Sequence, residues 1–222
     1  MSISLDEAVD LTRTGDVWVF RGRSVPDRAI QFTTNSPVNH VGMAVVLDDM
    51  PPLMWHAELG RSLRDMWTGS HQRGVQLHDL RDAVCVWANR YGQRAWLRQL
   101  EPSADLAMEQ AVLQTVARLD GTPFPSTAQL AWRWARGRVP QLRMPGRRDR
   151  DDERADRQAG DRALETAYCA EVVAVTYEAM GLLPQGRRPN WYDPGRFWSG
   201  DDLDLAGDAR LGAEIEVHIP PR

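Results

Sequence analysis

Apolar runs bounded by turn-forming residues dominate the first half of the chain and predict β-strands. Runs of about four to eight apolar residues between Gly, Pro, Asn or Asp are typical of strands with at least one buried face. The strongest run covers residues 40–47 and is closed by Asp48 and Asp49, and the next run predicts its hairpin partner. We therefore predict a β-rich first half, arranged as a meander. Its expected strands cover residues 16–20, 40–47, 53–58, 75–78 and 83–87.

The second half of the chain changes to a helical pattern. Apolar residues recur at helical spacing over 103–119 and again over 168–180. This spacing predicts helices with a buried face, and Gly121 and Gly181 follow at positions suited to ending them. Three further elements are predicted: a short helix over 5–14, a Trp-containing amphipathic stretch over 126–136 and a final strand within 214–219.

Residues 146–162 lack the apolar positions that a packed element needs. They are almost entirely Arg, Asp, Glu, Ala and Gly, and their opposite charges nearly cancel. A segment of this composition has little apolar surface to bury on folding. We predict a charged, solvated and mobile insertion within a single domain that spans residues 1–222.

Composition narrows the class of protein. With 222 residues, of which 42% are hydrophobic, the chain can bury a sizeable core. The net charge of -4 argues against broad nucleic-acid binding, and two cysteines are too few for a disulfide scaffold.

No apolar run reaches the ~18 residues of a membrane-spanning helix, and the start lacks a cationic segment followed by an apolar one. We expect a cytoplasmic protein without a membrane span, unless export follows a route that the sequence does not show.

The two cysteines have different predicted settings. Cys169 lies near the start of the predicted helix over 168–180. At such a position the helix dipole and unpaired backbone N–H groups stabilise a thiolate, which lowers the pKa of the cysteine and makes it nucleophilic. Cys85 lies within the predicted strand over 83–87, where an inert buried thiol is expected.

Two histidines on neighbouring predicted strands can supply a base. His40 opens the strongest strand, and His56 lies on its hairpin partner. Side chains alternate between the faces of a strand, so His56 and Glu58 share one face. The hairpin can place His40 beside His56 or beside Glu58, which supplies a base and a group that orients it. No role is predicted for the remaining histidines, His71, His78 and His218.

Four motifs in this order resemble those of circularly permuted NlpC-type, papain-like proteins, the YiiX/YaeF-like group. They are a Gly-Asp pair before a strand, a His-Val-Gly strand start, a Gly-x-Pro-Phe turn and a Tyr-Cys helix start. In this chain they read Gly15-Asp16, His40-Val41-Gly42, Gly121-Thr122-Pro123-Phe124 and Tyr168-Cys169-Ala170-Glu171.

The resemblance implies an α+β, permuted papain-like fold, in which an antiparallel sheet or small barrel packs against the helix that bears the nucleophile. It also implies that Cys169 is the nucleophile, that His40 is the base and that a polar residue on the next strand orients it. His56 occupies that slot, as in the related lecithin:retinol acyltransferase group, and Glu58 is the alternative. Tyr168 is a weaker candidate for positioning the substrate, and the backbone N–H of Cys169 for stabilising an oxyanion.

The leading functional expectation is a thiol hydrolase that cleaves an amide (peptide-like) or ester bond through an acyl-enzyme, without metal or cofactor. Transfer of lipid acyl groups is the related alternative. A second class is a non-catalytic binding module, and a third is a metal site formed by Cys169, His40 and His56. The binding module would use a tryptophan-rich surface, which comprises Trp132, Trp134, Trp191 and Trp198.

Overall fold

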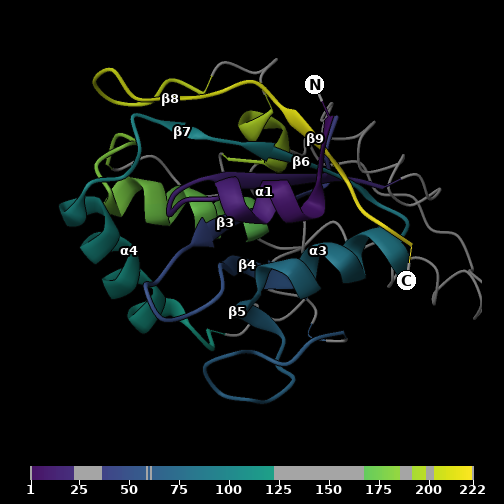
Figure 1. The fold of residues 1–222 in the computed structure, drawn as a ribbon. Helices are drawn as coiled ribbons and strands as arrows, with labels where there is room; N and C mark the ends of the chain where they lie inside the picture. Colours follow the sequence, from purple (N-terminus) through teal and green to yellow (C-terminus); the bar gives the residue numbers. More distant parts are fainter. Residues whose placement is uncertain are drawn as a thin grey trace, which may run out of the picture.

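A seven-stranded sheet in the order β1-β9-β6-β2-β3-β4-β5 forms the centre of the protein (Figure 1). The computed structural model describes residues 2–22, 37–58, 60, 62–122, 168–185, 192–198 and 203–221. The strands of this sheet are β1 (Ser2–Ser4), β2 (Val17–Arg21), β3 (His40–Val45), β4 (Leu53–Glu58), β5 (Gly74–Asp79), β6 (Arg94–Arg98) and β9 (Ile215–His218). β7 (Leu100–Glu101) and β8 (Arg210–Leu211) form a second, two-stranded sheet.

The predicted meander is present. β2, β3, β4 and β5 follow one another in the sheet, and each neighbouring pair is antiparallel. β1 pairs with β9 in parallel, so the sheet is mixed rather than wholly antiparallel. The fold is therefore α+β, as predicted, and it is built around a mixed sheet.

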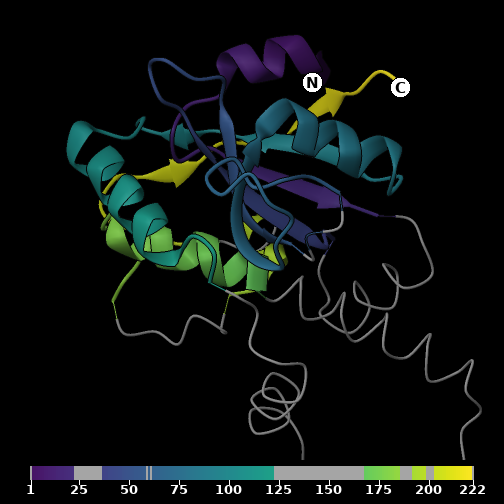
Figure 2. The ribbon, with the colours of Figure 1, turned by 90° about the horizontal axis from the view of Figure 1, so that it is seen from below.

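Helices lie on both sides of the sheet (Figure 2). In the described part of the chain, besides a short 3-10 helix, η2 (Pro194–Phe197), they are α1 (Leu5–Leu11), α3 (Leu80–Asn89), α4 (Leu106–Leu119) and the helical residues 168–179. Residues from α1 and α3 share one buried apolar cluster with Trp18 and Met54. Residues from α4 and from 168–179 share the other with Val19 and Trp55. These two clusters define an α3 face and an α4 face of the sheet.

The predicted strand over 83–87 is wrong, because these residues belong to α3. The side chain of Asp79 caps that helix by accepting a hydrogen bond from the backbone N–H of Asp82. Leu80, Ala83, Val84 and Trp87 are buried at helical spacing along one side. The run Val84-Cys85-Val86-Trp87 is too short for apolar content alone to separate a strand from a buried helix. Cys85 is buried, as predicted, but on a helix.

The sequence interpretation did not include β6, a central strand. β6 lies between β2 and β9 and is antiparallel to both. Its apolar run is only three residues long, Ala95 to Leu97, and is bounded by the charged Arg94 and Arg98. The other predicted elements that fall on described residues are present, most of them with shifted ends: α1 ends at Leu11, and α4 begins at Leu106 after an Asp105 cap.

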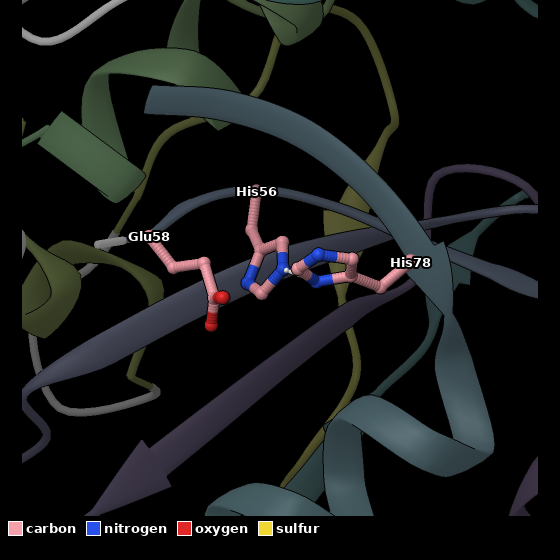
Figure 3. A group of neighbouring side chains, drawn as sticks. All are labelled: His56, Glu58 and His78. Carbon is pink, nitrogen blue, oxygen red and sulfur yellow. Dashed lines mark hydrogen bonds between the residues drawn. The ribbon is translucent and has the colours of Figure 1, made fainter. Parts of the chain in front are cut away.

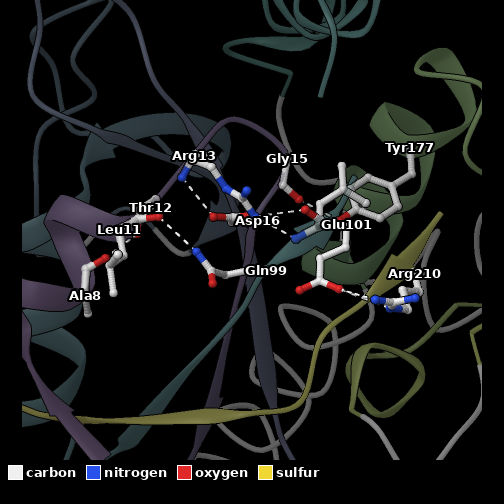
Figure 4. A network of polar contacts seen from close by, with 11 residues as sticks. Ala8, Leu11, Thr12, Arg13, Gly15, Asp16, Gln99, Glu101, Tyr177 and Arg210 are labelled. Atoms are coloured by element: carbon white, nitrogen blue, oxygen red, sulfur yellow. Dashed lines mark hydrogen bonds and ion pairs between the residues drawn. The ribbon is translucent and has the colours of Figure 1, made fainter. Parts of the chain in front are cut away.

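The Gly-Asp pair that the sequence singled out fixes the helical residues 168–179 to the sheet (Figure 4). The hydroxyl of Tyr177 donates to the backbone oxygen of Gly15 at 2.6 Å. Gly15 has a φ of 90°, and an added Cβ would lie 2.9 Å from the Leu100 side chain. Asp16, fully buried, accepts hydrogen bonds from the backbone N–H groups of Arg13 and Leu100. This motif therefore has a structural role at the junction of β2, β7 and the helix.

Several predictions lie outside the described residues. They include the insertion over 146–162, the amphipathic stretch over 126–136 and the tryptophans Trp132, Trp134 and Trp191. In the part of the chain that the structure describes, no helix is both long and apolar enough to cross a membrane.

Candidate functional site: a buried histidine–carboxylate cluster

Five polar side chains project from the α3 face of β3, β4 and β5. Strand alternation places them there, because the register pairs Ala44 with Met54 and Met54 with His78, and residues two positions apart share a face. None is more than 2% exposed. We call them the polar cluster; they are His40, His56, Glu58, Gln76 and His78.

A glycine on β3 makes room for the cluster. A Cβ at Gly42 would lie 2.3 Å from the sulfur of Met54 and 3.4 Å from the Cβ of His56. Any side chain at residue 42 would therefore have to displace Met54, which is itself fully buried. Gly42 therefore allows β4 to place His56 against β3.

The side chain of Trp87, on α3, packs against the polar cluster. Its ring stacks on that of His40, with centroids 3.8 Å apart and an interplanar angle of 21°. Phe20 of β2 packs against both rings, with its ring centroid 5.7 Å from that of His40 and 5.5 Å from that of Trp87. The aromatic rings on this face therefore hold His40 in one orientation.

The three imidazoles form a hydrogen-bonded chain. His40 Nε2 lies 2.9 Å from His56 Nδ1, and His56 Nε2 lies 2.8 Å from His78 Nδ1. A neutral imidazole has one N–H donor and one acceptor nitrogen. His56 therefore donates one of the two hydrogen bonds and accepts the other. Of the two nitrogens at the ends of the chain, His40 Nδ1 and His78 Nε2, one carries a proton and the other carries a lone pair.

The rings of this chain are neutral at physiological pH. Burial, and then the charge of His78, lower the pKa of His40 to about 3. Burial and the two neighbouring rings lower the pKa of His56 well below its usual range. Burial lowers the pKa of His78 to about 4, although the nearby Asp65 carboxylate opposes this effect. Neutral imidazole is the form that binds metal ions.

Glu58 completes a possible set of metal ligands (Figure 3). One ligand atom each from His56, Glu58 and His78 lies within 4.8 Å of the other two. Burial raises the pKa of Glu58 to about 7, and the hydroxyl of Ser62 opposes this by hydrogen bonding to the carboxylate at 3.3 Å. Glu58 can thus lose its proton near neutral pH when a cation binds.

Some buried atoms of the cluster have no hydrogen-bond partner within the described part of the chain. They are His40 Nδ1, His78 Nε2 and Gln76 Oε1. A buried polar atom without a partner costs about 1–3 kcal/mol, so native proteins seldom retain such atoms without a reason. Three such atoms lie in this one cluster, where they are available to pair with a water or a ligand.

The structure brings together only some of the predicted site residues. His40 and His56 are in contact as expected, and Glu58 lies close to His56. Cys169 is fully buried in the apolar cluster of the α4 face, which also contains Val41 and Trp55. The side chains of Val41 and Trp55 point to the face of the sheet opposite to that of His40 and His56, their neighbours in sequence. The predicted nucleophile and the predicted base therefore pack on opposite faces of the sheet.

The remaining predicted residues lie near Cys169 or outside the cluster. Tyr168 is half-buried against the α4-face core. Residue 167 is not among the described residues, so the expected helix-start position of Cys169 stays a prediction. Trp198 packs on Trp96, with ring centroids 5.3 Å apart.

The sequence interpretation missed His78, although its pattern contained a signal. Gln76 and His78 alternate with the apolar Val75 and Leu77 along β5. A hairpin between β4 and β5 brings this polar face beside His56. The missing information was that α3 buries this face, because those helical residues were predicted to form a strand.

Comparison with known proteins gives little further guidance. No family model matches the chain, and no curated protein does. Among solved structures, the crystal structure of the metalloprotein yiiX from Escherichia coli O157:H7 matches with 23% sequence identity and a TM-score of 0.37. The match covers 52% of this chain and 54% of the other, so the chain spans about half the length of that protein. It is consistent with the resemblance to the YiiX-like group, does not show a circular permutation and carries no argument about function.

Proposed function

We propose that this protein binds one divalent transition metal ion, with Zn²⁺ as the first candidate, through His56, Glu58 and His78. The observation that carries the proposal is the convergence of two neutral imidazoles and a carboxylate within 4.8 Å. All three side chains are almost fully buried. Unpartnered polar atoms next to these ligands add support.

The donor set fits a metal site with an open coordination position. Two imidazoles and one carboxylate hold zinc in many catalytic sites, where a water or substrate takes the fourth position, and closed structural sites use four protein ligands instead. In catalytic sites of this kind, a metal-bound water would supply a nucleophile near neutral pH wherever a substrate can reach the ion. Imidazole and carboxylate ligands also suit Fe²⁺.

Binding requires a small local rearrangement. Ligands of a tetrahedral zinc ion lie about 3.3 Å apart, given bonds of roughly 2.0–2.1 Å. His56 Nε2 and His78 Nδ1 are only 2.8 Å apart, so an ion bound between them replaces their hydrogen bond. His56 then carries its proton on Nδ1 and donates it to His40 Nε2, which fixes the tautomer that binds metal.

Charge balance also favours a dication. Three neutral imidazoles contribute no charge, and an ionised Glu58 contributes one negative charge. Asp65, which is 1% exposed, places a second carboxylate close enough to influence His78. Two carboxylates offset the charge of one divalent ion in a region that solvent does not reach.

Calorimetric titration of chelator-treated protein with Zn²⁺ tests the proposal. We expect one ion per chain, and at least a 100-fold loss of affinity in His78→Ala and Glu58→Gln. His218→Ala, which removes an exposed histidine outside the cluster, should bind like the wild type. Circular dichroism of each metal-free variant confirms that it is folded. Wild-type affinity in folded His78→Ala would contradict the proposed ligand set.

A thiol hydrolase that acts on amide or ester bonds is the second candidate. It is supported by the hydrogen bond between His40 and His56, the pair expected to supply the base and its orienting group. It ranks second because Cys169 packs on the opposite face of the sheet.

The same variants separate the two functions. If Cys169 is the nucleophile, Cys169→Ala abolishes turnover of an acyl or amide substrate found by screening and leaves Zn²⁺ affinity unchanged. His40→Ala should also abolish turnover, and His56→Ala should lower it by ~10²–10⁴-fold. Iodoacetamide should then label Cys169 far faster than Cys85. Equally slow labelling of both thiols would argue against this mechanism.

A further inference from the structure

Two arginines lie directly opposite each other on neighbouring central strands. Arg21 ends β2 and Arg94 begins β6, and the antiparallel register pairs them. Like charges in directly opposed positions destabilise a sheet. The pairing therefore calls for a compensating interaction.

Two tryptophans hold both guanidinium groups in place. The Cζ atoms of Arg21 and Arg94 lie 5.5 and 4.9 Å from the centroid of the Trp96 ring. Arg21 also lies 5.2 Å from the ring of Trp198, which meets Trp96 edge to face. Cation–π contacts of this kind use the face of a guanidinium and leave its N–H edge free for hydrogen bonds.

Carboxylates balance only one of the two charges within the described residues. Arg94 forms an ion pair with Glu216 of β9. Arg21 donates its Nε–H to the backbone oxygen of Pro37, and no described carboxylate forms an ion pair with it. Burial, and then the charge of Arg94, lower the pKa of Arg21. Among the carboxylates of the described residues, none therefore offsets the charge of Arg21 by an ion pair.

The ion pair at this position is accessible from solvent. The side chains of Arg94 and Glu216 are 41% and 40% exposed. A small ligand can therefore reach Arg94.

We propose that Arg21 and Arg94 form a binding site for an oxyanion, the phosphate or carboxylate group of a small ligand. The forked N–H groups of arginine match the oxygens of both groups. The site is separate from the polar cluster. Trp96 and Val19 define its face, and Val19 belongs to the apolar cluster of the α4 face. The proposal therefore does not depend on metal binding.

Glu216 gives the proposal a distinctive prediction. It competes with the bound anion for Arg94 and repels it, so its neutralisation should strengthen binding. The pair is half-exposed, and such pairs add little to stability, so Glu216→Gln should remain folded. Most other substitutions in a binding site weaken binding, which makes a gain in affinity diagnostic.

The test is titration of the full chain with inorganic phosphate at constant ionic strength, followed by calorimetry and by thermal unfolding. We expect at least a 10-fold loss of affinity in Arg21→Gln and at least a 3-fold gain in Glu216→Gln. Arg210→Gln, which removes an exposed arginine paired with Glu101, should behave like the wild type. A parallel titration with acetate shows whether carboxylates share the site. Undiminished phosphate binding in Arg21→Gln, no gain in Glu216→Gln, or no binding of either anion to the wild type would overturn the proposal.

Discussion

At the residue scale, the polar cluster combines close packing with incomplete hydrogen bonding. His40, His56 and His78 are held by two hydrogen bonds and by the ring of Trp87, yet both end nitrogens lack a partner in the described structure. A cluster that served stability alone would be better filled by apolar side chains of similar volume. Metal binding explains why two imidazoles and a carboxylate converge at this buried position.

The space beside Gly42 leads to a prediction about packing. Gly42→Ala should lower the free energy of unfolding by ~1–3 kcal/mol, because the new methyl group displaces Met54 and presses on His56. It should also weaken Zn²⁺ binding, because it moves a ligand. Chemical denaturation and calorimetry measure the two effects.

Gly69→Ala is the matched control for this substitution. Gly69, unlike Gly42, has a left-handed backbone, with a φ of 67°, and a Cβ there meets nothing within 4 Å. It should cost about 1 kcal/mol through backbone conformation alone and leave Zn²⁺ affinity unchanged. If Gly42→Ala cost no more stability than Gly69→Ala and likewise preserved Zn²⁺ affinity, the close packing around His56 would be in doubt.

Glu58 should make the stability of the metal-free protein depend on pH. Its pKa rises from an ordinary 4.5 to about 7 on folding, so between these values the folded state binds more protons than the unfolded state. Its contribution is therefore fully present below pH 4.5 and is lost as pH rises through 7. The loss amounts to roughly 2–4 kcal/mol, from the size of the shift.

Comparison with Glu58→Gln isolates this contribution, because the histidines affect both proteins alike. Their lowered pKa values destabilise both folded states as pH falls below about 6.5. The stability of Glu58→Gln relative to wild type should rise between pH 4.5 and 8. A difference that does not vary with pH would show that Glu58 titrates normally.

At the element scale, two buried hydrogen bonds help to fix the helical residues 168–179 over the sheet. Thr176 Oγ1 accepts a hydrogen bond from the indole N–H of Trp55 at 3.1 Å, and Tyr177 donates to Gly15. All four residues are buried. They belong to β4, to the helical residues 168–179 and to the turn before β2. These contacts set which helix face packs on the sheet, and hence where Cys169 lies.

Tyr177→Phe tests this attachment. The substitution keeps the ring but leaves the buried Gly15 carbonyl without its side-chain donor, so it should cost about 1–2 kcal/mol of unfolding free energy. Tyr91→Phe, at an exposed position, should change stability by less than ~0.5 kcal/mol. Equal effects of the two substitutions, measured by urea denaturation, would show that the Tyr177 hydroxyl does not secure the helix.

At the scale of the whole molecule, the sequence predicted local elements better than their long-range arrangement. The meander from β2 to β5 follows from apolar runs and short turns, and the contact between His40 and His56 follows from the meander. The parallel pairing of β1 with β9 joins the two ends of the described chain, which no local pattern reveals. The position of β6 between β2 and β9 is equally non-local.

One local error had consequences for the site. Residues 83–87 of α3 were predicted to form a strand. The prediction therefore contained no helix that covers the sheet face on which His78 lies. The motif resemblance indicated a reaction between Cys169 and His40, but apolar packing places these two side chains in different layers. The metal site proposed in its place, formed by His56, Glu58 and His78, depends on how α3 packs over the sheet.

X-ray absorption at the zinc edge of the loaded protein is the measurement that tests the central claim most directly. We predict a first shell of nitrogen and oxygen ligands only, at about 2.0–2.1 Å, with the outer-shell scattering of two imidazoles. This shell should be lost or altered in His78→Ala and preserved in His218→Ala. A sulfur ligand at about 2.3 Å would instead indicate a site that includes a cysteine, and it would contradict the assignment to His56, Glu58 and His78.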